Sequence, residues 1–154
     1  MLKRILKNEK GLTLIELLAV VVILGVIAAI AVPAIGKIIE DSKNKAVVSD
    51  ALQIINAAKI AKANNPNETT FIADGIKGNA TTPSQELDDY LDTQVKATTT
   101  VTYTSGGKWE IDGHTDLAAL KTKLGTTDDP FSTKPLEEEL VNFLDGKTKK
   151  TTTP

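Results

Sequence analysis

Residues 11–36 of this chain read GLTLIELLAVVVILGVIAAIAVPAIG, and this stretch decides the fold. From Leu17 to Gly36 it holds twenty residues without a charge. A helix of that length spans about 30 Å, the thickness of the hydrocarbon core of a bilayer. Val and Ile are only moderate helix formers, but in lipid every backbone polar group needs an internal partner. The sequence therefore predicts a membrane-crossing helix near the N-terminus.

The charges before this segment predict its orientation. The first ten residues, MLKRILKNEK, carry four basic side chains, which are Lys3, Arg4, Lys7 and Lys10. Basic flanks stay on the cytoplasmic side of a membrane helix. We therefore expect a single-pass precursor in the cytoplasmic membrane, with its N-terminus inside and the rest of the chain outside.

Glu16 is the unusual residue of the segment. An ionised side chain deep in a membrane helix costs about 2.5–3.5 kcal/mol, so a carboxylate in such a place is a candidate for function. The cost is smaller near a helix end, and a Glu16 that reaches water at the interface is the alternative. A plain membrane anchor leaves both Gly11 and Glu16 without explanation. A cleaved secretory signal, with its cleavage site after the apolar run, requires a shorter apolar segment than this one.

The third interpretation explains all of these features. A short basic leader ending in Gly11, then Glu16, then an uncharged apolar run resembles the class III signal of type IV pilins and of the pseudopilins of type II secretion. The resemblance implies that Gly11 is the last leader residue and that a prepilin peptidase cleaves before Leu12. The same enzyme is expected to methylate the new amino group of Leu12, a position at which many family members carry Phe or Met.

The resemblance also implies that Glu16 is needed for methylation and for the registration of subunits. Cleavage places a new α-amino group four residues before this carboxylate. Between staggered subunits the two charges would pair in an apolar filament core, which offsets their desolvation. Gly25 and Pro33 lie where pilins of this group carry helix-weakening residues. A proline kink of the kind that membrane helices tolerate is the other interpretation of Pro33.

The function implied is structural. The resemblance indicates the major pilin of a type IV pilus, a helical homo-oligomer on the cell surface that serves adhesion, motility or DNA uptake. Its expected partners are the prepilin peptidase, the membrane before assembly, an assembly platform and ATPase, and minor pilins. The alternatives are a major pseudopilin of type II secretion and, from another class, a monomeric membrane-anchored extracellular binding domain. No enzymatic activity is expected, because the chemistry is done to this chain.

The expected fold is α+β, a pilin fold. A long N-terminal helix, half transmembrane and half amphipathic, packs on a small globular domain with an antiparallel β-hairpin or sheet and short helices. The predicted parts are a leader (1–11), a transmembrane and filament-core helix (12–36), its amphipathic continuation (37–65), a globular head domain (66–146) and a disordered tail (147–154).

Composition narrows the class further. The chain has 154 residues, a formal net charge of −2 and no cysteine. The leader carries +3, so the remainder carries −5, which gives no general footprint for nucleic acid. Many Gram-negative pilins close a C-terminal loop with a disulfide. Its absence favours a Gram-positive pilin or a domain stabilised by a cation.

Periodicity predicts the elements after the membrane segment. An apolar stripe at helical spacing predicts that the helix continues until Asn64-Asn65-Pro66 ends it. The stripe consists of Val48, Ala51, Leu52, Ile55, Ala58 and Ala61. Residues 67–83 have the composition of a loop, and a short helix is expected through Leu87, Tyr90 and Leu91. Residues 97–113 predict a hairpin that turns at Ser105-Gly106-Gly107 and has one apolar face, formed by Val101, Tyr103, Trp109 and Ile111. Two more short helices are expected near 116–124 and 136–144, ended by Gly125 and Gly146.

The candidate sites in the head domain are few. Asp128 and Asp129, before Pro130 and Phe131, loosely resemble a calcium-binding loop of major pseudopilins, and a simple turn is the alternative. His114 is the only histidine, so we expect it to be solvated and not a catalytic or zinc-binding group. Lys147, Lys149 and Lys150 form a basic cluster, for which DNA contact is conceivable but otherwise unsupported.

Overall fold

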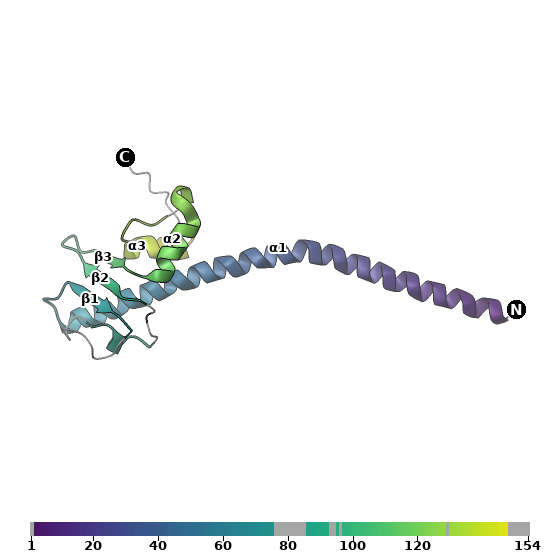
Figure 1. Ribbon diagram of the computed structural model, residues 1–154, viewed down its shortest axis with the longest axis horizontal. Coiled ribbons are helices and arrows are strands. Elements are labelled where there is room, and N and C mark those ends of the chain that lie inside the picture. The colour runs from purple at the N-terminus through teal and green to yellow at the C-terminus, as the bar shows by residue number, and fades with distance from the viewer. Residues whose placement is uncertain (1, 76–85, 93–94, 96, 129, 148–154) are drawn as a thin grey trace. The chain divides into compact units, whose positions relative to one another are not determined.

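The computed structural model describes the backbone of residues 2–75, 86–92, 95, 97–128 and 130–147, and side chains within these ranges from residue 14 onward except 126–128. The chain divides into two compact units, Met1–Ser42 and Lys43–Pro154, which we call the N-terminal and the C-terminal unit. The first contains only helix. The second contains helices and strands, so the predicted α+β class is confirmed (Figure 1).

Helix α1 runs from Leu2 to Asn64 and supplies residues to both units. Its end agrees with the Asn-Asn-Pro stop predicted from the sequence. In the N-terminal unit the side chains from Leu14 to Ile39 are almost all exposed and apolar. This helix is long and apolar enough to cross a membrane, as the sequence predicts.

In the C-terminal unit one face of α1 is buried. The predicted stripe is confirmed, since Val48, Ala51, Ile55, Ala58 and Ala61 are fully buried, while Leu52 is half-buried. Ile54 and Ala57 widen the stripe. These side chains form one hydrophobic core with Phe71, Val101 and Ile111 of the sheet.

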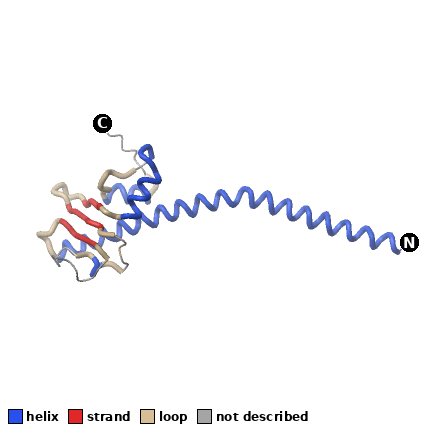
Figure 2. The backbone as a smooth tube through the Cα atoms, viewed as in Figure 1, coloured by secondary structure: helices blue, strands red, loops and turns tan. Residues whose placement is uncertain are grey.

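The sheet has three antiparallel strands among the described residues, in the order β1-β2-β3 (Figure 2). Strands β2 (Thr99–Tyr103) and β3 (Trp109–Asp112) form the predicted hairpin, with Val101 opposite Ile111 and Tyr103 opposite Trp109. The apolar face is also as predicted: Val101 and Ile111 are buried, and Tyr103 and Trp109 are half-buried.

Strand β1 (Thr70–Ala73) corrects the sequence analysis, which assigned these residues to a loop. Phe71 and Ala73 are fully buried, and Phe71 pairs with Val101 across the sheet. The strand has only four residues and is held by pairing with β2, a partner thirty residues away in the chain. Local composition does not report such a partner, which is why the Asn- and Thr-rich context was misleading.

The short helices follow the prediction with changes at their ends. Helix α2 (Thr115–Asp128) is interrupted at Gly125, which has a φ of 72°. The regular helix therefore stops at the glycine that was predicted to end it. Helix α3 (Glu137–Leu144) ends before Gly146, whose φ is 70°. The helix expected around Leu87–Leu91 is a single 3-10 turn, η2 (Asp88–Tyr90). Its predicted start at residues 82–85 lies outside the described residues, as does most of the predicted tail.

Candidate functional site

The first candidate site is the start of α1. Gly11 and Leu12 lie in the backbone of this helix, and their side chains are outside the described part of the chain. Leu12 and Glu16 are four residues apart, so a terminal amine created at Leu12 would lie about 6 Å along the helix axis from the level of Glu16, or one turn. The helix thus places the amine of a processed Leu12 and the carboxylate of Glu16 at the same end of the apolar segment, as the prepilin interpretation requires.

Glu16 is exposed and surrounded along the helix by apolar side chains. The neighbouring Leu14, Ile15, Leu17 and Leu18 are each more than 60% exposed. From residue 14 to residue 36 Glu16 is the one ionisable side chain. An apolar surface this large must be covered by lipid or by other protein, and Glu16 then needs a cationic partner or a path to water.

Gly25 and Pro33 both lie inside α1, which continues through them. Pro33 donates no backbone hydrogen bond, so the carbonyl of Ala29 lacks its usual helical partner. A Cβ added at Gly25 would meet no other atom within 4 Å. The glycine is therefore not required by packing within one chain, and its helix-weakening role stays a prediction.

The comparison with protein families bears on this segment. A family model described as the prokaryotic N-terminal methylation motif matches residues 6–32. This match supports the resemblance of the chain to type IV pilins and pseudopilins, whose class III signal the motif describes. No curated protein and no solved structure matches it. The matched range contains Gly11, Leu12 and Glu16, and the motif implies processing by a prepilin peptidase, a membrane-anchored precursor and assembly into a pilus.

The second candidate site, the acidic pair near the C-terminus, is not defined by the structure. Asp129 and the side chain of Asp128 lie outside the described residues. Among the residues that the structure describes, no group of three or more His, Cys, Asp or Glu side chains is placed to hold a metal ion. Calcium binding by the pair stays a prediction. A melting temperature that rises on addition of calcium would support it, and an unchanged one would rule it out.

The segment after this pair is fastened by polar contacts that sequence reasoning missed. Glu139 Oε2 accepts hydrogen bonds from the backbone N–H groups of Ser132 (3.1 Å) and Leu136 (3.0 Å), and the Ser132 hydroxyl lies 2.9 Å from the same oxygen. Lys121 Nζ donates to the carbonyl oxygens of Ser132 and Thr133. These contacts close the loop in a chain that has no disulfide.

The same segment is joined to the sheet and to α1. The N–H of Ile111 donates to Pro135 O (3.0 Å), and Lys59 on α1 forms an ion pair with Glu137 on α3. The rings of Phe131 and Phe143 lie 5.2 Å apart. The C-terminal segment is thus held at the outer edge of β3 by contacts from three elements. An acidic residue three positions into a helix is a known capping signal, and it would have pointed to Glu139.

A buried carboxylate fixes the other side of the sheet. Asp88 is only 3% exposed, and its two oxygens accept hydrogen bonds from the backbone N–H groups of Asp74 and Gly75, both at 3.0 Å. It therefore holds the chain where β1 ends. Nothing in the local sequence distinguishes Asp88 from its exposed neighbour Asp89.

His114 corrects the expectation of a merely solvated side chain. It is half-buried, and its Nδ1 accepts a hydrogen bond from the backbone N–H of Leu117 (3.1 Å), so the ring caps the first turn of α2. This role was not predicted, because histidine is not among the preferred N-cap residues.

Proposed function

We propose that this chain is the major subunit of a type IV pilus. The observation that carries the proposal is the exposed apolar surface of α1 from Leu14 to Ile39, in which Glu16 is the one charge before residue 37. A membrane covers such a surface in a monomer, and neighbouring copies cover it in a helical filament. A single carboxylate in that surface is stabilised where a cation pairs with it. The α-amino group at the processed N-terminus of a neighbouring copy is such a cation.

The proposed course has three steps. The precursor enters the cytoplasmic membrane with its basic N-terminus inside. A prepilin peptidase cleaves between Gly11 and Leu12 and methylates Leu12. An assembly ATPase and platform protein then move the subunit into the filament, where Glu16 pairs with the N-terminus of a neighbour and fixes the axial register. Minor pilins complete the assembly, and the filament serves adhesion, motility or DNA uptake.

The first test is the state of the protein in its host. Cells are sheared, and the released high-molecular-weight material is analysed by mass spectrometry of the intact protein. We expect the mass of residues 12–154 plus one methyl group. A full-length mass found only in membranes would contradict the proposal. A processed mass that never appears in the sheared fraction would favour a pseudopilin, which fits the same motif.

The second test separates a filament subunit from a plain anchor. Glu16→Ala should still insert and be found in membranes, but the sheared filament fraction should be lost because register is no longer fixed. Glu40→Ala is the matched control, since Glu40 is an exposed carboxylate on the same helix outside the apolar run. Normal filaments from Glu16→Ala would exclude the registration role.

A further inference from the structure

His114 lies at the junction of β3 and α2, where the backbone conformation is tightly constrained. Gly113 has a φ of 79°, and a Cβ added there would overlap the carbonyl oxygen of Thr98. The carbonyl of His114 accepts the N–H of Ala118 (2.9 Å), and its Nδ1 accepts the N–H of Leu117. Both contacts belong to the first turn of α2. The ring can cap this turn only while Nδ1 has no hydrogen, which means that the cap requires the neutral imidazole.

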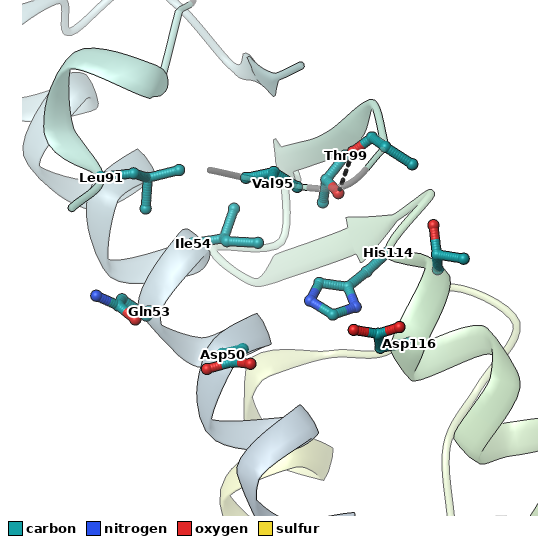
Figure 3. Close-up of a pocket in the computed structure, with 10 residues that line it drawn as sticks. Asp50, Gln53, Ile54, Leu91, Val95, Thr99, His114 and Asp116 are labelled. Carbon is teal, nitrogen blue, oxygen red and sulfur yellow. Dashed lines mark hydrogen bonds between the residues drawn. The ribbon is translucent and has the colours of Figure 1, made fainter. Parts of the chain in front are cut away.

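Charged side chains line both cavities beside His114. The ring lines a cavity of about 100 Å³ together with Asp50 and Gln53 of α1 and Asp116 of α2 (Figure 3). The far wall of this cavity is apolar and includes Ile54, Leu91 and Val95. His114 also lines a second cavity, of about 210 Å³, with Asp112 of β3 and Lys121 of α2.

These groups act on the protonated ring in opposite directions. The N-terminus of α2 carries a partial positive charge that disfavours an imidazolium in the capping position. The carboxylates of Asp50 and Asp116 at the cavity favour an imidazolium that faces them. Asp112 favours the charged ring and Lys121 opposes it from the second cavity. The neutral ring is thus stable at the helix end, and the charged ring is stable toward the first cavity.

We propose that His114 is a pH-sensitive cap of helix α2. As the pH falls, the ring takes up a proton from water at Nδ1, the hydrogen bond from Leu117 breaks, and the imidazolium turns to Asp50 and Asp116. The first turn of α2 then loses its cap. Imidazole titrates between about pH 5 and pH 8, so the change falls within the range that a cell surface meets.

The experiment uses the full chain in detergent micelles, labelled with 15N-leucine and ring-13C histidine. His114 is the only histidine, so a single imidazole titration is observed. The Leu117 amide resonance should shift with the same midpoint as the ring, and its hydrogen-exchange protection factor should fall roughly two- to thirtyfold in acid, the range expected for loss of an N-cap. A Leu117 amide that does not change while the ring titrates would overturn the proposal.

Two variants locate the cause. His114→Asn keeps an N-cap acceptor and removes the titration, so Leu117 should stay protected across the whole range. If Leu117 in His114→Asn shows the same shift as in the parent protein, another group is responsible and the proposal fails. Asp50→Asn combined with Asp116→Asn should move the midpoint of the ring to lower pH. An unchanged midpoint would overturn the role of the carboxylates.

Discussion

Glu139 shows how much of the C-terminal unit depends on one side chain. Its carboxylate accepts hydrogen bonds from the backbone N–H groups of Ser132 and Leu136 and lies beside the Ser132 hydroxyl, which also donates to the carbonyl oxygen of Lys134 (2.6 Å). Glu139→Ala should lower the free energy of unfolding by about 1–3 kcal/mol, because two half-buried backbone N–H groups lose their acceptor. Unfolding of the full chain in detergent can be followed by the fluorescence of Trp109, the only tryptophan.

The neighbouring residue provides the control. Glu138 is exposed at the adjacent position of α3, and Glu138→Ala should change stability by no more than about 0.5 kcal/mol. Equal losses from the two variants would show that helix charge, and not the contacts of Glu139, holds the loop.

Asp88 is expected to stabilise the other side of the sheet in the same way. Asp88→Ala removes the acceptor for two backbone N–H groups at the end of β1, and should cost about 2–3 kcal/mol. Asp89→Ala, at an exposed position of the same 3-10 turn, should cost little. Hydrogen exchange of Asp74 and Gly75 gives a direct measurement, and unchanged protection in Asp88→Ala would refute this account.

At the scale of elements, the C-terminal half of α1 is a core helix with one buried face. Ile55 is fully buried on this face, while Ile60 is 55% exposed. Ile55→Ala should destabilise the unit by about 2–5 kcal/mol, because it removes buried apolar surface and leaves a cavity. Ile60→Ala is the matched control and should change stability by less than about 0.5 kcal/mol. Thermal unfolding of the two variants in detergent measures both losses of stability, and equal losses would contradict the prediction.

The elements that the sequence predicts well are those with a local signal. The apolar stripe of α1, the alternation in the β2–β3 hairpin and the glycines at helix ends all depend on residues close in the chain. Strand β1 depends on β2, and the carboxylates of Asp88 and Glu139 depend on donors that the fold brings to them. The prepilin signal was predictable because cleavage and insertion read a linear sequence, whereas the capping role of His114 exists only in three dimensions.

At the scale of the whole molecule, the character of α1 predicts how filaments respond to solvent. The exposed surface from Leu14 to Ile39 is apolar, with Glu16 as its charge before Lys37. Filaments should therefore persist in about 1 M NaCl, where surface ion pairs are screened, and dissociate in detergent. Electron microscopy and sedimentation of sheared filaments measure both effects. Dissociation by salt alone would show that contacts among charged C-terminal units hold the filament.

Each outer edge of the three-stranded sheet carries one isolated β-bridge. On one side Ile72 of β1 forms a single parallel bridge to Glu86, and on the other Glu110 of β3 forms an antiparallel bridge to Leu136. Unpaired strand edges are the usual starting points of amyloid-like aggregation when copies of a protein are crowded together. A filament crowds its subunits by construction. The two bridges cover part of each edge and shorten the backbone that a neighbouring sheet could pair with, which works against aggregation of closely packed copies.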